Sequence, residues 1–126
     1  MGSLGYACIG TNDFDGALRF YDALFGAMGG RRLMTTPAGE IYALESGAAV
    51  GIVRPFDGQP AHPGNGTMLA FRVSSHPEVA RLHELAMALG ASDEGAAGPR
   101  ADFGTFAYVR DPDGNKLAFY YRERNS

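Results

Sequence analysis

The sequence predicts an α+β fold in which a unit of one strand, one helix and further strands occurs twice. A short apolar run leads into an amphipathic helix near the start of the chain, and the same order returns in the second half. Only two stretches show helical periodicity, against several with the character of strands. Because a parallel sheet with helical crossovers would need more helices, this ratio favours mostly antiparallel pairing.

Length and composition set the outer limits of function. The 126 residues suffice for one domain with a sizeable core. The formal net charge is −3 and no basic run occurs, so we expect no nucleic-acid partner. No apolar stretch approaches the ~20 residues that span a bilayer, so we expect no membrane partner. The only cysteine, Cys8, excludes an internal disulfide and, without an N-terminal signal pattern, predicts a cytoplasmic protein.

The first copy opens with a strand at residues 6–11. Asn12 or Asp13 then caps a helix, because a short polar side chain accepts hydrogen bonds from the first backbone N–H groups. The helix ends at the glycine pair 29–30, since glycine adopts the left-handed conformation of a C-cap. Its apolar residues recur with spacings of three and four and form one buried stripe: Phe14, Ala17, Leu18, Tyr21, Leu24 and Phe25.

Three further strands and a linker complete the first half. The strands are expected at 32–35, 41–46 and 49–54, separated by turn-forming residues. Residues 55–66 hold three prolines and three glycines, which prevent a regular element. We therefore expect a single domain over 1–126, made of module 1 (about 4–54), the linker 55–66 and module 2 (about 67–122).

The second copy repeats this order. A strand at 67–73 leads into a helix whose sequence SHPE is a capping box, with Ser75 as the cap and Glu78 reaching back to its N–H. The helix closes at Gly90, and residues 94–104 are expected to form a loop. Two strands at 106–110 and 116–122 are joined by DPDGN, a strong hairpin signal in which the aspartates make the turn.

The two copies align when the first is shifted by 62 residues. Ile9 then falls on Phe71, Thr11 on Val73, and Tyr6 on Met68. Each helix can cover only one face of its sheet, so the other faces are available to curl around a cavity.

Strand alternation predicts which side chains point into that cavity. The first strand offers a phenol and a thiol, and the second copy offers a thioether, a guanidinium and a second phenol. This wall suits a flat or mostly apolar small molecule with an anionic or carbonyl end, which Arg72 could hold bidentately. The expected lining residues are Tyr6, Cys8, Gly10, Met68, Ala70, Arg72, Ala118, Tyr120 and Arg122.

Each of these residues also has a purely structural interpretation. The two phenols could pack together, Met68 could fill an irregular gap, and Cys8 could be an inert thiol. Arg72 could pair with an acidic residue such as Asp102 or Glu94. The histidines do not form a metal cluster in the sequence pattern, because those on the second helix lie seven residues apart, about 10 Å along its axis.

Three segments of the chain, taken together, resemble a known family. The carriers are NDFDGALRFYDALFGAMG after the first strand, GNGTMLAFRV at the start of the second half and VRDPDGNKLAFYY at the end. In this order they resemble the vicinal oxygen chelate superfamily, which holds glyoxalase I, bleomycin-resistance proteins and extradiol dioxygenases. The resemblance implies two tandem βαβββ modules that form a curved, mostly antiparallel sheet around a cleft.

The resemblance also implies where a metal ion would be held. Metalloenzymes of this family use His, Gln or Glu from the first and last strand of each module to bind a divalent ion that acts as a Lewis acid. The first-strand positions match Tyr6 and Met68, and the terminal-strand position of module 2 matches Ala118. Module 1 offers Val50, Gly51 or Ile52 at its terminal position. A phenol is a poor ligand unless deprotonated and a thioether prefers soft ions, so no metal and no other cofactor is expected.

Two functions from different classes follow from the resemblance. The first is a protein similar to the bleomycin-resistance branch, which binds a small organic molecule in the cleft to sequester or sense it. The second is an enzyme, a glyoxalase-like lyase or isomerase or a dioxygenase, that uses a displaced metal or acid–base chemistry by Tyr6 or Tyr120. A scaffold with a filled cleft is a third possibility. The exposed sheet edges also predict a homodimer.

Overall fold

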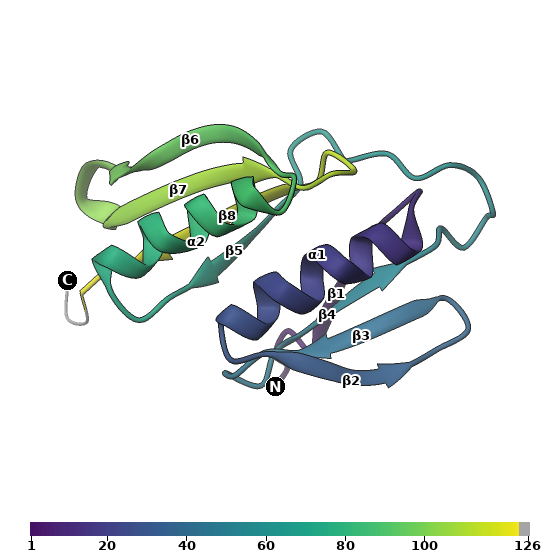
Figure 1. Ribbon diagram of the computed structural model, residues 1–126. Helices are drawn as coiled ribbons and strands as arrows, with labels where there is room; N and C mark the ends of the chain where they lie inside the picture. Colours follow the sequence, from purple (N-terminus) through teal and green to yellow (C-terminus); the bar gives the residue numbers. More distant parts are fainter. Residues whose placement is uncertain (124–126) are drawn as a thin grey trace. The chain divides into compact units, whose positions relative to one another are not determined.

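The computed structural model describes residues 1–123 and divides the chain into two compact units, Met1–Pro63 and a second that begins at Gly64 (Figure 1). Each unit holds one helix and one four-stranded sheet. The helix of each unit lies across one face of its own sheet. The structure thus has the α+β architecture and the duplicated units that the sequence predicts. Residues 124–126 of the predicted domain lie outside the described residues.

The first unit contains a mixed sheet in which the first and last strands are neighbours. Its strand order is β1-β4-β3-β2, with β1 and β4 parallel and the other pairs antiparallel. The elements are β1 (Tyr6–Gly10), α1 (Phe14–Ala27), β2 (Arg31–Thr35), β3 (Gly39–Ala43) and β4 (Ala49–Val53).

The second unit repeats this arrangement. Its order is β5-β8-β7-β6, again with the first and last strands parallel and the others antiparallel. The elements are β5 (Met68–Arg72), α2 (His76–Ala88), β6 (Ser92–Pro99), a short 3₁₀ turn η1 (Ala101–Phe103), β7 (Thr105–Arg110) and β8 (Lys116–Tyr121).

The pairing register is the same in both units. Tyr6 lies opposite Ala49 in the first, and Met68 lies opposite Lys116 in the second. The first, third and fourth strands of one sheet therefore correspond position by position to those of the other, whereas β2 and β6 differ in length and in their irregular steps. The repeat therefore extends from the sequence to the hydrogen-bonding pattern of the strands.

Both helices begin at a side-chain cap that the sequence predicts. The Asp13 carboxylate accepts a hydrogen bond from the backbone N–H of Gly16 at 3.0 Å, and the Ser75 hydroxyl accepts one from the N–H of Glu78 at 3.3 Å. The predicted capping box is only half formed. The Glu78 carboxylate instead accepts two hydrogen bonds of 2.6 Å from Arg81, one turn further along the helix.

The cores of the two units divide their large side chains differently between helix and sheet. In the first unit most of the large buried side chains come from the helix, including Phe20 and Leu24, although the sheet adds Tyr42. In the second unit the helix contributes smaller residues such as Ala86, and the sheet contributes Phe119. Since interiors are close-packed, a large residue on one layer requires a small one opposite.

The expectation of a loop at 94–104 is wrong. Most of this stretch belongs to β6, which pairs with β7 through two irregular steps, and the rest contains η1. Its composition of glycine, alanine and proline gives no strand signal. Pairing with the hairpin strand β7 supplies the backbone hydrogen bonds that the local sequence does not specify.

The other boundaries differ from the predictions by small amounts. The strand expected at 41–46 lies at Gly39–Ala43, and no helix or strand occupies the predicted linker 55–66. Asp111 forms the hairpin turn as expected, since its carboxylate accepts from the N–H groups of Asp113 and Asn115 at 2.9 and 2.8 Å. No helix among the described residues is long and apolar enough to cross a membrane.

Candidate functional site

We call the face of each sheet that points away from its helix the open face. On the open face of the second sheet the side chains form rows. Paired residues of neighbouring strands point to the same side of a sheet. One row crosses the sheet as Arg72, Tyr120, Phe106 and Gly98. The next row holds the small residues Ala70 and Ala118, followed by Tyr108 and Gly95. A third row holds Met68, Lys116, Arg110 and Ser92.

Three aromatic rings on this face are stacked nearly parallel. The centroids of Phe106 and Tyr120 are 5.0 Å apart, with an angle of 11° between the ring planes. Phe106 and Tyr108 are 6.1 Å apart at 16°. All three side chains are half-buried. Offset stacking is a preferred arrangement of aromatic groups, so the three rings stabilise one another and form one continuous aromatic surface.

Two cationic side chains converge on Tyr108. The Lys116 ammonium lies 5.2 Å from the centre of this ring, and the Arg100 guanidinium lies 5.3 Å from it. Arg100 occupies space that the β6 glycines leave open: its guanidinium is 3.3 Å from where a Cβ on Gly95 would lie. Within residues 1–123, neither Arg100 nor Lys116 forms an ion pair with a carboxylate.

Arg72 stands at the β5 end of the aromatic row. Its guanidinium lies 5.9 Å from the ring centre of Tyr120 and 5.6 Å from that of Tyr121, and it donates a hydrogen bond to the carbonyl of Arg122. The alternative in which Glu94 pairs with Arg72 is not what the structure contains. Glu94 instead accepts a 2.8 Å hydrogen bond from Arg110.

The open face of the first sheet is made of smaller side chains. Equivalent to the aromatic residues Phe106, Tyr108 and Tyr120 are Gly39, Ile41 and Val53. Tyr6, with 60% of its surface exposed, and Cys8 point away from the helix, as predicted, while Ile9 is buried beneath α1.

The structure therefore places the predicted site residues on two sheets. Tyr6 and Cys8 lie on the first, and Met68, Arg72, Ala118 and Tyr120 lie on the second. Met68 and Arg72 are exposed and Tyr120 is half-buried, but Ala118 has no exposed surface.

Sequence reasoning missed two rings of the open face, Phe106 and Tyr108, and the two cations beside Tyr108, Arg100 and Lys116. Phe106, Tyr108 and Lys116 were detectable, because alternation along two strands that the sequence does predict places them on the side of Tyr120. Arg100 was not detectable, since it reaches the face from the end of a strand that carries no strand signal.

The register also identifies the terminal-strand position of the first unit. Gly51 pairs with Cys8 as Ala118 pairs with Ala70, so Gly51 is the equivalent of Ala118 and the other two candidates point toward α1. Within residues 1–123 no three side chains of the types His, Cys, Asp and Glu cluster in a way that could hold a metal ion.

Two histidines of α2 make specific contacts that their predicted place on the helix surface does not reveal. His76 Nδ1 lies 2.8 Å from the Thr105 hydroxyl and its Nε2 lies 3.1 Å from the Glu123 carboxylate. His83 Nε2 lies 3.0 Å from Asp93. The backbone N–H of Gly95, together with His83, holds the pKa of Asp93 below its usual value. These contacts fasten α2 to the strands beside it.

A charged cluster in the first unit has a similar structural role. The Asp22 carboxylate accepts hydrogen bonds from Arg32 at 2.8 and 2.9 Å and from the Tyr42 hydroxyl at 2.8 Å. The Arg32 hydrogen bonds hold the pKa of Asp22 below its usual value. Burial, reinforced by the hydrogen bond to Asp22, raises the pKa of Tyr42. The cluster joins α1 to β2 and β3.

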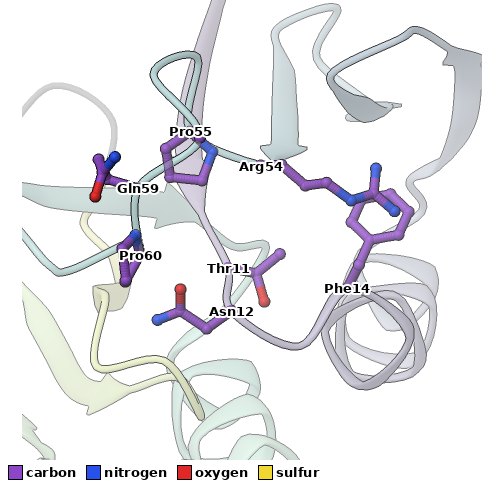
Figure 2. Close-up of a pocket in the computed structure, with 8 residues that line it drawn as sticks. Thr11, Asn12, Phe14, Arg54, Pro55, Gln59 and Pro60 are labelled. Carbon is purple, nitrogen blue, oxygen red and sulfur yellow. The ribbon is translucent and has the colours of Figure 1, made fainter.

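A hollow of about 370 Å³ lies in the first unit where β1 leads into α1 (Figure 2). The Arg54 guanidinium covers the Phe14 ring at 3.9 Å, and Asn12 is fixed by two 2.7 Å hydrogen bonds to the backbone of Ala61. The hollow is lined by Thr11, Asn12, Phe14, Arg54, Pro55, Gly58, Gln59 and Pro60.

Residues 3–119 match the model of the Glyoxalase/Bleomycin resistance protein/Dioxygenase superfamily. The chain belongs to this superfamily. A glyoxalase/bleomycin resistance protein from Albidiferax ferrireducens T118 shares 33% identity and superposes with a TM-score of 0.85 over 95% of this chain and 98% of that one. The expected resemblance and fold class are thereby confirmed.

Other superfamily structures are similar at lower identity. A glyoxalase-related enzyme from Fulvimarina pelagi is 25% identical, with a TM-score of 0.79 over 97% of this chain and 89% of that one. The fosfomycin resistance protein FosX from Listeria monocytogenes is 18% identical, with a TM-score of 0.75 over 98% of this chain and 96% of that one, and shows the shared fold alone. A search of curated proteins finds no significant match.

Proposed function

We propose that this member of the glyoxalase/bleomycin resistance superfamily binds a small organic molecule at the open faces of its sheets, where the predicted cleft residues lie. Binding would serve to sequester or sense the molecule. We further propose that binding occurs without the divalent ion of the family's metalloenzymes. The predicted homodimer is an additional expectation of the same proposal.

The residue types at the family's metal positions carry this proposal. The four positions hold Tyr6, Met68, Gly51 and Ala118. Glycine and alanine have no donor atom, and a thioether prefers soft ions to Zn²⁺, Ni²⁺ or Mn²⁺. Tyr6 alone could offer an oxygen, and a phenol is mostly protonated at neutral pH, since its ordinary pKa is about 10. One weak donor does not make a site for a hard cation.

The test combines a metal analysis with binding measurements. Purified protein is dialysed, its Ni, Zn, Mn and Fe contents are measured, and a fragment library is screened by ligand-observed NMR with and without EDTA. We expect less than stoichiometric metal and at least one ligand whose binding EDTA does not change. One tightly held metal ion per chain, or binding that EDTA abolishes, would contradict the proposal.

The same measurements address the alternative of an enzyme with a displaced metal. A metal that binds through the Tyr6 phenol would be lost in Tyr6→Phe and kept in the control Tyr120→Phe. If the unmodified protein retains metal and Tyr6→Phe does not, the lyase or dioxygenase interpretation replaces the binding protein.

A further inference from the structure

The open face of the second sheet concentrates positive charge in a protein whose net charge is negative. Arg72, Arg100 and Lys116 each lie over one of its aromatic rings, at 5.2 to 5.9 Å from the ring centre. A cation over a ring face is stabilised by the ring quadrupole, which holds the charge at the face without neutralising it. The face therefore presents a positive field beside a flat apolar surface.

Arg110 and Lys116 lie side by side on the open face but have different partners. Arg110 is paired with the Glu94 carboxylate at 2.8 Å. Lys116, its direct neighbour across the strands, extends instead toward Tyr108, where Arg100 also lies. Two like charges near one ring repel each other, and an anion beside Tyr108 would be attracted by both.

We propose, building on the proposed function, that the open face of the second sheet binds a planar conjugated organic anion. The ring system of this ligand packs against the stacked rings of Phe106, Tyr108 and Tyr120. Its carboxylate or similar group accepts hydrogen bonds from Arg100 and Lys116, and Arg72 contributes a second positive charge at the far end of the aromatic row.

The chemistry of the face limits the ligand class. A saturated ring lacks the π system that offset stacking requires, and an organic cation is repelled by three like charges. A free inorganic anion would use the cations and leave the aromatic surface exposed to water. A ligand that is both flat and negatively charged would contact the three rings and the three cations together.

The test uses four matched probes with a similar skeleton. These are 2-naphthoate, the neutral 2-naphthalenemethanol, the cationic 2-naphthylmethylammonium and the saturated decahydro-2-naphthoate. Dissociation constants are measured by NMR titration of the full-length protein, and the shifted resonances locate the site. We expect 2-naphthoate to bind about tenfold or more tightly than the alcohol and the ammonium probe, the scale of one charge-assisted hydrogen bond. It should bind roughly two- to tenfold more tightly than the saturated acid, which keeps the charge and loses only the aromatic contact.

Variants then connect the preference to particular side chains. Arg100→Gln combined with Lys116→Gln is expected to reduce 2-naphthoate affinity about tenfold and to remove the preference over the alcohol. The charge-conserving pair Arg100→Lys and Lys116→Arg should largely restore it, which guards against a loss caused by misfolding. Tyr108→Leu should weaken the binding of 2-naphthoate and of the neutral alcohol. The matched controls Arg81→Gln on α2 and Phe103→Leu in η1 should change nothing.

The outcomes separate this inference from the proposed function. If library fragments bind independently of EDTA but 2-naphthoate binds no better than the alcohol, the anionic ligand class is wrong and the proposed function stands. If the saturated acid binds as well as 2-naphthoate, the planar requirement is wrong. If resonances shift outside the open face of the second sheet, the assigned location is wrong.

Discussion

The two units of this protein share one backbone plan, yet their two faces have diverged in different ways. On the face beneath each helix, large and small side chains have exchanged layers between the units, with Leu24 and Ile52 in one and Ala86 and Phe119 in the other. On the open face, Ile41 in one unit corresponds to Tyr108 in the other. The covered face must conserve its total volume, whereas the open face is free to change its chemistry.

This difference explains why the repeat is easier to recognise by element order than by side-chain identity. Pairing register and helix position depend on the backbone and on the apolar pattern, which both units keep. The side chains of the open faces determine neither the register nor the position of the helix. They can therefore differ between the units: one sheet carries small aliphatic side chains and the other carries rings and cations. Four predictions test this comparison.

The largest effect is expected in the core of the second unit. Phe119→Ala should cost about 3–5 kcal/mol of unfolding free energy, because it leaves a cavity where the side chain was fully buried. Urea denaturation followed by circular dichroism gives the value. The control Met87→Ala, on an exposed part of α2, should cost less than about 0.5 kcal/mol. A cost below about 1 kcal/mol for Phe119→Ala would show that the sheet layer is not the main core component.

Gly39→Ala should have the next largest effect, about 1–3 kcal/mol. A Cβ at this position would lie 2.0 Å from the carbonyl oxygen of Ile52, so the backbone of β3 or β4 must shift. The equivalent residue of the second unit is Phe106, which occupies the same register position with a full side chain. Phe106→Ala provides the comparison for the second unit. Equal, small costs for the two variants would contradict the close approach at Gly39.

The exchange of large and small side chains between the layers can be tested by placing the residue pair of the first unit in the second. Ala86→Leu alone should cost about 1–3 kcal/mol, because it overfills the second core. Adding Phe119→Ile, which reproduces the residue pair of the first unit, should recover part of that loss. A double-mutant cycle measures the coupling. Strict additivity of the two costs would mean that these positions do not share one packing space.

The smallest effect concerns the Asp22 cluster, which the second unit replaces with Glu84 and Val109 at the equivalent positions. Because the folded state lowers the pKa of Asp22, its contribution is present above the ordinary value of 3.8 and is lost as the pH falls below it. The pair is largely exposed, so we expect less than about 1 kcal/mol. Denaturation curves of Asp22→Asn should show a weaker loss of stability between pH 5 and 2 than the unmodified protein, with Asp15→Asn as the control.

The sequence predicted most of the fold because the signals were local. Capping by Asp13 and Ser75, the stripe on each helix and the Asp111 turn can each be recognised within a few residues. The strand β6 was missed because its glycines and alanines carry no preference, and only the hydrogen bonds of β7 select the extended form.

The candidate site was predictable in part for the same reason. Alternation along a strand fixes which side chains share a face, and so Met68, Arg72 and Tyr120 could be grouped from the sequence. The position of Arg100 depends on the path of the chain between β6 and β7, which local patterns do not encode. Burial of Ala118 likewise depends on how its larger neighbours lie.

The parallel pairing of first and last strands has a consequence for synthesis of the chain on the ribosome. β1 emerges early but pairs in the sheet with β4, so this pairing cannot form until residues 49–53 have been translated. The sheet of the first unit can then form while the second unit is still being synthesised. In the second unit β5 likewise pairs with β8, which is translated last. Contacts between strands that are distant in the sequence slow folding. Because each unit is continuous in the sequence, all strands of the first are synthesised before those of the second.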